Sequence, residues 1–283
     1  MPELPEVEVL VRHLRPQLRG KIIRAVHVRR TKVLQPTTPR ELQRALAGAK
    51  FKNVTRRGKH LLFELRSPAA GKDFQLLGHL GMTGRMFLAR KKEPLPKHAA
   101  VILDLGTEHF IYEDTRYFGR LTLDTSAVEK LGPEPWDAAF LPEEFRRQLK
   151  KSRQPVKVKL LDQSLVAGVG NIYASEALFR AGLSPRRAAN RISRAEARKL
   201  LSAIRAVLQE AIDGGSTLPL NFQTGESDGL FYFGRAAGAP DYFSERLNVY
   251  DRAGKPCIHC GAAIRRIVQA TRSTFFCPHC QKR

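Results

Sequence analysis

Cysteine is absent from the first 256 residues of this 283-residue chain, and all four cysteines lie within the last 27 residues. The disulfide framework of a secreted protein would spread cysteines along the fold, so this distribution argues against one. Paired cysteines near one end of a chain are instead typical of metal ligands. The cysteines therefore indicate a metal site in an otherwise cysteine-free protein.

Long hydrophobic runs are also lacking. No apolar stretch approaches the ~20 residues that a membrane-spanning helix needs. No charged and then apolar leader precedes the first expected element. We therefore expect an intracellular protein that has no membrane partner.

Acidic residues are scarce relative to basic ones: 27 Asp and Glu face 49 Lys and Arg, which gives a formal charge of +22 at pH 7. Solubility alone does not require so large an excess, and a large polyanion is the expected partner. The basic residues recur along nearly the whole chain, so the positive field belongs to folded surfaces and not to one charged tail. Binding to a ribosome or to a membrane surface is the alternative.

The N-terminal part of the sequence alternates short apolar segments with turns. Apolar residues recur at helical spacing between residues 7 and 18, which predicts a helix that begins near Pro5 and is bent or ended early by Pro16. A short helix is expected near 40–47. The other segments are β-branched or aromatic, predict a β-sandwich, and lie at 22–28, 60–65, 74–77, 100–105, 109–112 and 121–123.

A change of periodicity divides the chain. The run GPEP at 132–135 places a domain boundary near 125–140, and the sequence beyond it has helical spacing. The clearest helix there begins with a capping box, SRAE at 193–196, and carries apolar residues up to the glycines at 214 and 215. From 216 to about 243 the sequence has no period and is rich in Gly, Pro and aromatic residues, which predicts a functional or mobile loop.

The four cysteines have the spacing of a tetrahedral metal site. Two pairs, CIHC at 257–260 and CPHC at 277–280, are separated by sixteen residues, and each pair supplies two thiolates from one tight turn. Because a site filled by four protein ligands leaves no position for catalysis, we expect one structural zinc ion held by Cys257, Cys260, Cys277 and Cys280. A disulfide or a redox pair is the alternative. His259 and His279 are expected to be bystanders.

The spacer between the two cysteine pairs combines basic and hydroxyl side chains: Arg265, Arg266, Thr271, Arg272, Ser273 and Thr274. This composition suits a hairpin that lies on the phosphates of a nucleic acid. A hairpin whose charges are simply solvated is the alternative.

Together with this zinc element, the N-terminal run MPELPEVE and five internal motifs resemble the formamidopyrimidine-DNA glycosylases over the whole chain. The motifs occur in the family's order: RGKHLL at 57–62, HLGMTG at 79–84, RYFG at 116–119, GVGNIYASE at 168–176 and TRSTF at 271–275. The resemblance implies an α+β chain with an N-terminal β-sandwich and helix, a helical helix-two-turn-helix domain, and a C-terminal zinc finger. The implied domains are 1–130, 131–243 with a lesion-recognition loop at about 216–243, and 244–283.

The resemblance also implies a function, the excision of oxidised purines such as 8-oxoguanine and formamidopyrimidines from double-stranded DNA. The implied enzyme is both a glycosylase and an abasic-site lyase, prefers cytosine opposite the lesion, and uses no redox or nucleotide cofactor. We expect a monomer in the cytoplasm or nucleoid of a bacterium. The alternatives are the related glycosylases for oxidised pyrimidines and, outside this class, a non-catalytic zinc-finger DNA-binding protein. The acid and proline residues at the N-terminus and the run RYF at 116–118 favour the purine enzymes.

Catalytic residues carry over from the family motif by motif. Once Met1 is removed, Pro2 has a secondary amine that attacks the sugar as the base departs, and the resulting iminium ion promotes elimination of both flanking phosphates. An α-amino group has an ordinary pKa near ~8, so part of it is unprotonated at neutral pH. The resemblance makes Glu3 the proton shuttle, Glu6 a supporting acid, and Lys59 a contact to the lesion and its phosphate.

Residues that replace the extruded base carry over in the same way. Chemistry on a stacked base requires its extrusion from the duplex. The family fills the hole with residues that match Met82, Arg116 and Phe118, and Arg116 would bond to the orphaned cytosine. This chain has Tyr117 where many relatives carry a basic residue. One phosphate contact is therefore expected to be weaker or to come from the hydroxyl.

The remaining matches are DNA-binding residues: His79, Lys157, Asn171 and Arg272, of which Arg272 also belongs to the implied catalytic set. The glycines before Asn171 predict a tight turn into a helix whose free N–H groups bind phosphate. Arg272 would grip the phosphates around the extruded nucleotide.

Overall fold

The computed structural model describes residues 2–68, 71–214 and 247–282. These residues form two compact units: the first comprises Pro2 and residues 6–129, and the second comprises residues 3–5, 130–214 and 247–282. The predicted lesion-recognition loop at 216–243 lies outside the described residues. The division into three domains at 1–130, 131–243 and 244–283 stays a prediction.

Helix α1 (Leu4–Leu18) begins the chain, and its first two residues belong to the second unit. Its apolar side chains recur at helical spacing and are fully buried at Val7, Val11, Leu14 and Leu18. Pro16 lies inside the helix and does not end it, so the predicted early end is wrong. Proline removes one backbone hydrogen bond, and the burial of the leucines on either side of it offsets that loss.

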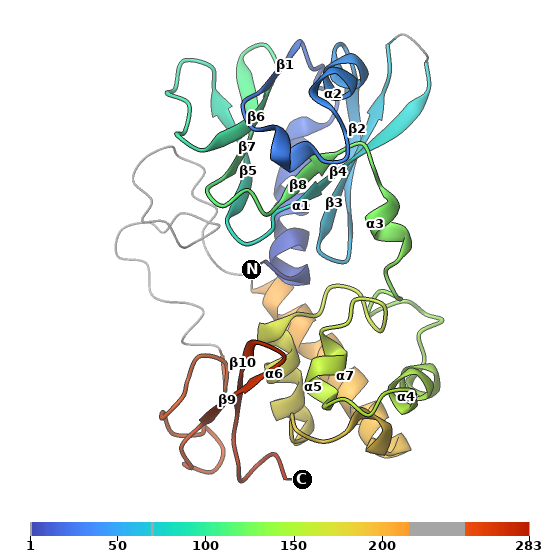
Figure 1. Cartoon of the computed structure of the whole chain (residues 1–283), viewed down its shortest axis with the longest axis vertical. Coiled ribbons are helices and arrows are strands. Elements are labelled where there is room, and N and C mark those ends of the chain that lie inside the picture. The colour runs from blue at the N-terminus through green and yellow to red at the C-terminus, as the bar shows by residue number, and fades with distance from the viewer. Residues whose placement is uncertain (1, 69–70, 215–246, 283) are drawn as a thin grey trace. The chain divides into compact units, whose positions relative to one another are not determined.

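The first unit contains two four-stranded antiparallel sheets, which confirms the predicted β-sandwich (Figure 1). Their strand orders are β2-β3-β4-β8 and β1-β6-β7-β5. Phe63 of the first sheet meets Phe110 of the second edge to face, with ring centroids 5.5 Å apart. The two sheets therefore share one buried aromatic core. The strands are β1 (Ala25–Val28), β2 (Lys50–Arg57), β3 (His60–Arg66), β4 (Asp73–His79), β5 (Gly84–Arg90), β6 (Ala99–Asp104), β7 (Glu108–Asp114) and β8 (Arg120–Thr122).

Short helices connect these strands. The 3-10 helix η1 (Thr31–Leu34) and helix α2 (Pro39–Leu46) lie between β1 and β2, and α3 (Ser126–Glu129) follows β8. The predicted strands missed β2 and β5, because both mix basic residues with their apolar ones.

The second unit is helical, as predicted (Figure 1). Its helices are α4 (Pro142–Lys150), α5 (Val156–Leu160), α6 (Asn171–Ala181), the 3-10 helix η2 (Ala189–Arg191) and α7 (Arg194–Asp213). Helix α7 begins at the predicted capping box, where Ser193 and Glu196 bond to each other's backbone N–H groups. Residues of α4, α6 and α7 share one apolar cluster that fixes the position of α6. This matters because the candidate site lies at the start of that helix.

Two short strands form the C-terminal hairpin, β9 (Arg265–Gln269) and β10 (Arg272–Phe276). Ala270 and Thr271 both have positive φ angles, 45° and 62°, which is the geometry of a two-residue hairpin turn. This turn places Arg272 at the very start of β10. The cluster beneath the hairpin is small and consists of Phe179, Val249, Cys257, Ile264, Phe275 and Cys277.

Candidate active site and nucleic-acid interface

The Glu3 carboxylate lies at the N-terminal end of helix α6. Its Oε1 accepts a hydrogen bond from the backbone N–H of Ile172 at 2.9 Å, and its Oε2 accepts one from Tyr173 at 3.4 Å. The residue is only 2% exposed. The first N–H groups of a helix have no partner within it and carry partial positive charge, so a carboxylate is stabilised there. Glu3 is therefore held in one place by the backbone of a different part of the sequence.

Two glycines make this approach possible. A Cβ atom at Gly170 would lie 2.3 Å from the Glu3 Cδ, and one at Gly168 would lie 2.4 Å from a methyl group of Leu4. Gly168 also has a φ of +89°, which favours glycine, and its carbonyl accepts the Leu4 N–H at 3.1 Å. The motif GVGN thus accommodates the N-terminal residues.

This arrangement corrects the expectation that the N–H groups at the start of α6 are free for phosphate. Those of Ile172 and Tyr173 bond to Glu3. The side chain of Asn171 does not cap the helix and points to the zinc hairpin, where its Nδ2 donates to the Ser273 carbonyl at 2.9 Å.

Lys157 completes a buried polar group with Asn171. The side chain is fully buried, and its Nζ donates to Asn171 Oδ1 and to the Ser273 carbonyl at 3.5 Å. Burial is the main cause that lowers the pKa of Lys157 to about 8; the Glu3 carboxylate opposes this shift and the nearby Arg272 adds to it. Two further predicted site residues, Glu3 and Arg272, are therefore close enough to Lys157 to shift its pKa.

Tyr250 joins the same group, although the sequence analysis missed it. Burial raises the pKa of Tyr250, and its side chain bonds with Asn171 near Glu3 and Arg272. The buried carboxylate of Glu176 holds this segment: it accepts the backbone N–H groups of residues 248, 249 and 250 at 2.8 to 2.9 Å. The five residues Glu3, Lys157, Asn171, Tyr250 and Arg272 are called the Glu3 cluster below.

The predicted catalytic residues of the first unit occupy buried positions. Pro2 is buried, Glu6 is 5% exposed in the first turn of α1, and Lys59 is 7% exposed. Lys59 lies in the tight turn between β2 and β3, where Gly58 has a φ of +56°. Lysine side chains are seldom this buried unless their ammonium group is paired.

His79 ends strand β4, and its ring is neutral at physiological pH. Burial lowers the pKa of His79 to about 3, and the neighbouring His60 and Lys59 add to the shift. Its Nδ1 accepts the backbone N–H of Gly81 at 3.1 Å. The neutral ring therefore carries its proton on Nε2, which makes it a hydrogen-bond donor without charge.

Met82, Arg116 and Phe118 come together on two loops of the first unit. The Nη1 of Arg116 lies 3.5 Å from the Met82 sulfur, and its guanidinium carbon lies 4.7 Å from the centre of the Phe118 ring. Met82 is 37% exposed and Phe118 is 48% exposed. Met82 and Phe118 therefore present apolar surface to solvent on adjoining loops, and contiguous exposed apolar surface often marks a binding site.

The four cysteines fit a tetrahedral zinc site. Their sulfur atoms all lie within 4.8 Å of one another, with Cys257 and Cys280 3.8 Å apart and Cys260 and Cys277 3.5 Å apart. Zinc–sulfur bonds of ~2.3 Å in a tetrahedron require sulfur–sulfur distances of about 3.8 Å. The donor set is therefore that of one structural zinc ion, with no position left for a substrate.

Three family models match consecutive parts of the chain. The formamidopyrimidine-DNA glycosylase N-terminal domain matches residues 1–121, the H2TH domain of the same enzymes matches residues 131–221, and a zinc finger found in FPG and IleRS matches residues 254–283. The chain is 39% identical over 289 residues to the formamidopyrimidine-DNA glycosylase of Desulfitobacterium hafniense, covering 99% of this chain and 100% of the relative. The relative from Paracoccus denitrificans is 41% identical over 300 residues, with both chains fully covered.

The chain belongs to the formamidopyrimidine-DNA glycosylase family. A solved complex of a Lactococcus lactis FPG mutant with Fapy-dG-containing DNA is similar in structure, with a TM-score of 0.86, 34% identity and full coverage of both chains. A structure of MutM with DNA containing carbocyclic 8-oxo-G gives the same TM-score and identity, again with full coverage. Among the described residues, no helix combines the length and apolarity needed to span a bilayer.

An arginine from a distant segment, Arg30, lies beside the ring of Tyr117. Arg30 Nε donates to the Tyr117 hydroxyl at 3.1 Å, and the Arg30 guanidinium carbon lies 5.7 Å from the ring centre. Tyr117 itself has a φ of +54°. The Tyr117 hydroxyl therefore has the positive charge of Arg30 beside it.

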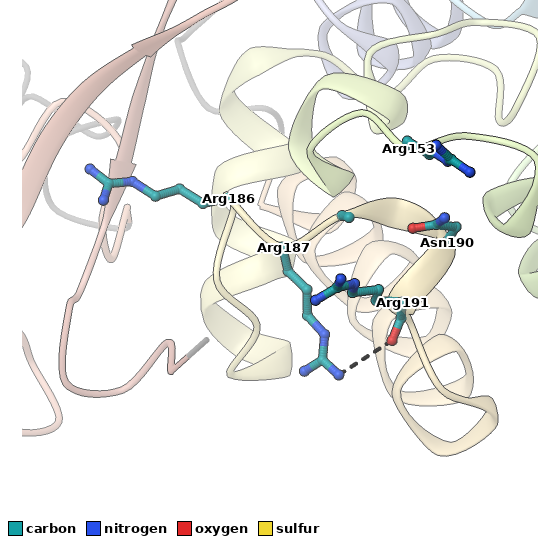
Figure 2. Close-up of a pocket in the computed structure, with 6 residues that line it drawn as sticks. Arg153, Arg186, Arg187, Asn190 and Arg191 are labelled. Carbon is teal, nitrogen blue, oxygen red and sulfur yellow. Dashed lines mark hydrogen bonds between the residues drawn. The ribbon is translucent and has the colours of Figure 1, made fainter.

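The second unit also has an arginine-lined pocket that lies outside the family motifs. A pocket of about 790 Å³ is lined by Arg153, Arg186, Arg187, Ala188, Asn190 and Arg191 (Figure 2). Arg187 is paired with Glu196 at 2.6 Å, and Arg186 lies over the Phe276 ring. The arginines in Figure 2 point in different directions. They do not converge as the Glu3 cluster does.

Proposed function

We propose that this chain excises oxidised purines from double-stranded DNA and then cleaves the strand at the abasic site. The observation that carries the proposal is the Glu3 cluster, in which a buried carboxylate follows Pro2 in the chain and shares its surroundings with Lys157 and Arg272. Relatives of this family are named formamidopyrimidine-DNA glycosylases, a name that supports the excision step.

The proposed nucleophile is the amine of Pro2 after removal of Met1. Its lone pair forms a bond to the sugar C1′ while the glycosidic bond breaks and the base leaves with the bonding electrons. Opening of the sugar then yields an iminium ion between the nitrogen and C1′. This ion withdraws electrons from the neighbouring C–H bonds, so that the 3′ and then the 5′ phosphate is eliminated. One nitrogen therefore serves both the glycosylase and the lyase steps.

Glu3 would move protons during these steps. A carboxylate adjacent in the chain to the nucleophile is suited to protonate the opening sugar oxygen and to accept a proton from the amine. Its two bonds to the start of α6 fix the position of the carboxylate. Glu6 is proposed as the supporting acid.

The phosphates would be held by donors of several kinds. Lys157 and Arg272 supply positive charge, Asn171 supplies an amide, and Lys59 supplies an ammonium group from the β2–β3 turn. His79 would donate from its neutral Nε2–H. Such contacts position the duplex and carry no sequence information.

Specificity for the opposite base is assigned to the exposed loops. Phe118 would wedge between bases, Met82 would fill the space of the extruded nucleotide, and Arg116 would donate to the orphaned cytosine. We propose that the protein acts on damaged DNA with cytosine opposite the lesion and acts as a monomer.

Borohydride trapping tests the mechanism. Protein whose intact mass shows removal of Met1 should become covalently bound to a duplex with 8-oxoguanine opposite cytosine when borohydride is present, because only an iminium ion is reduced to a stable amine. Protein that retains Met1 is the matched control and should neither excise the base nor be trapped. A failure of trapping in the processed protein would contradict the Pro2 mechanism.

A paired substrate assay tests the substrate class. Excision rates on duplexes containing 8-oxoguanine and thymine glycol should favour the purine lesion. Faster excision of thymine glycol would instead assign the chain to oxidised pyrimidines. Binding without excision of either base would leave a non-catalytic DNA-binding protein.

A further inference from the structure

We propose that Asp114 is a positioning residue for opposite-base recognition, because its buried carboxylate holds together the two loops that carry Met82, Arg116 and Phe118. The inference rests on the proposed function of these three residues. Asp114 ends strand β7 and is completely buried, beneath loops whose functional side chains are exposed.

One oxygen of Asp114 links the two loops directly. Its Oδ1 accepts a hydrogen bond from the Thr83 hydroxyl at 2.6 Å and one from the backbone N–H of Arg116 at 3.1 Å. Thr83 follows Met82 in the first loop, and Arg116 lies in the second. The Arg116 N–H also lies 3.2 Å from the Thr83 hydroxyl, so these three groups form a closed triangle.

The other oxygen fixes the far end of the second loop. Its Oδ2 accepts the backbone N–H of Gly119 at 2.9 Å and lies 3.4 Å from the Tyr112 hydroxyl. The three residues 116, 117 and 118 are therefore spanned by backbone bonds to one carboxylate. Tyr117 in the middle has a positive φ, an unfavourable geometry for a tyrosine that such bonds help to maintain.

The two loops also touch through their backbones. A Cβ atom at Gly81 would lie 2.5 Å from the backbone nitrogen of Gly119 and 2.7 Å from the backbone carbon of Phe118. A Cβ atom at Gly119 would lie 2.0 Å from the Tyr112 hydroxyl. Because no side chain separates the loops, a shift in one displaces the other.

The Asp114 carboxylate accepts hydrogen bonds on both of its oxygens, whereas the amide of an asparagine has only one acceptor oxygen. Each carboxylate oxygen faces one backbone N–H, that of Arg116 or that of Gly119. In Asp114→Asn the amide NH₂ must face one of these two donors in either orientation, and neither backbone N–H is able to turn away. Depending on the orientation of the amide, either the Gly119 N–H loses its carboxylate acceptor or the Arg116 N–H keeps only its 3.2 Å contact with the Thr83 hydroxyl, while the volume of the side chain stays the same.

Fixing the loops in advance matters for discrimination between bases. Arg116 would reach the opposite base from a backbone that is already ordered, so little of its binding free energy is spent on ordering the loop. If that backbone is less ordered, Arg116 is able to reach bases other than cytosine, and its hydrogen bonds to cytosine become weaker.

The test compares single-turnover excision of 8-oxoguanine placed opposite each of the four bases. For Asp114→Asn we expect excision opposite cytosine to fall about 10-fold, the scale of one hydrogen bond lost to a charged group. The ratio of rates for cytosine against adenine should move toward one. Cleavage and borohydride trapping on an abasic duplex should stay within about 2-fold, because that substrate has no base to extrude.

Two sets of controls separate positioning from folding. Leu65→Ala removes a fully buried side chain of β3 and should lower Tm without altering the opposite-base ratio. Thr83→Val removes the hydroxyl that bonds to Asp114, whereas Thr83→Ser keeps it. We expect the valine variant to lose discrimination and the serine variant to retain it.

The outcomes are distinct. If Asp114→Asn lowers Tm as Leu65→Ala does and keeps the wild-type ratio between opposite bases, Asp114 is structural only and the inference is overturned. If Asp114→Asn does not fold, the Thr83 pair decides: equal ratios in the valine and serine variants overturn the inference. A wild-type protein that excises no lesion would overturn the proposed function itself.

Discussion

The Glu3 cluster of the second unit and the Met82, Arg116 and Phe118 loops of the first unit differ in exposure and in what holds them. In the cluster, the Glu3 and Lys157 side chains are buried and held by hydrogen bonds of their own, Asn171 and Tyr250 are half-buried, and Arg272 is exposed at the start of β10. In the loops, the acting side chains are exposed, and the bonds lie in the backbone beneath them. Hydrogen bonds therefore hold the side chains of Glu3 and Lys157 themselves. In the recognition loops they hold the backbone and leave the side chains exposed.

Both regions depend on buried carboxylates in a chain whose net charge is +22. Glu3 binds two N–H groups at the start of α6, Asp114 binds those of residues 116 and 119, and Glu176 binds three from 248 to 250. A carboxylate accepts several hydrogen bonds at once and fixes donors from segments that are distant in sequence. These few acidic residues thus order the backbone beside the basic residues of the Glu3 cluster and beneath the exposed loops of Met82, Arg116 and Phe118.

Removing the zinc ion should disrupt the cluster most. Cys280→Ser takes away one of four ligands, and the small core under the hairpin has little else to replace the ~10–16 kcal/mol that a structural zinc contributes. We expect zinc content and DNA affinity to fall together, measured by metal analysis and by DNA titration. Arg272→Ala is the control and should keep one zinc per chain while binding DNA more weakly. Full DNA affinity in zinc-free protein would contradict the role of the hairpin.

Changing Glu3 should separate chemistry from binding. Glu3→Gln preserves the shape of the side chain, so lesion DNA should still bind while base excision falls by at least ~100-fold, the scale of acid–base assistance. Gly170→Ala should reproduce the loss, because the added Cβ would overlap the Glu3 carboxylate. Single-turnover rates with saturating protein measure both effects. Unchanged excision in Glu3→Gln would remove this residue from the mechanism.

Much of this arrangement is predictable from sequence, since its parts have recognisable side-chain patterns. The cysteine spacing predicted the metal cluster, and the run SRAE predicted the start of α7. The two glycines before Asn171 predicted the tight turn into α6. Each of these features depends on neighbours close in the chain, and such features leave a local signature.

The carboxylate contacts were not predictable in the same way. The partners of Asp114 and Glu176 are mostly backbone N–H groups, and every residue except proline has one, so no residue type marks them. The same reason explains why the N–H groups at the start of α6 were expected to be free, although Glu3 occupies them from about 170 residues away. Tyr250 was missed because the bonds from Glu176 that position it come from a distant helix.

Truncating Phe118 should affect the recognition loops and spare the cluster. Phe118→Ala leaves Glu3 and the N-terminal amine intact, so its deficit should lie in extruding a paired base, which costs a few kcal/mol. We expect excision of 8-oxoguanine opposite cytosine to fall about 10-fold and cleavage of an abasic duplex to change little. Matched single-turnover assays on both duplexes provide the measurement. Equal losses on the two substrates would refute the extrusion role.

The smallest expected effect concerns the charge of Lys157, whose pKa burial lowers from its ordinary 10.5 to about 8. Below pH 8 the buried ammonium is charged, which favours a bound phosphate but opposes folding. As pH rises from 8 to 10.5 the unfolded chain keeps a proton that the folded chain releases, so this group's contribution to the free energy of unfolding increases. Over the same range its contribution to DNA affinity decreases.

As pH rises, the contribution of Lys157 to the free energy of unfolding should increase while its contribution to DNA affinity decreases, and these opposite trends identify its effect. Lys157→Met has a similar length and no charge, so it should bind an abasic duplex several-fold more weakly than wild type at pH 7, and the difference should shrink toward pH 9.5. As pH rises from 7 to 9.5, wild type should gain stability relative to the variant, because only wild type has a lysine that binds fewer protons when folded. Titrations and denaturant melts of both proteins from pH 7 to 9.5 measure the two trends. A constant difference in affinity across this range would show that Lys157 contacts the DNA without its charge, and that burial has not brought its pKa into the working range.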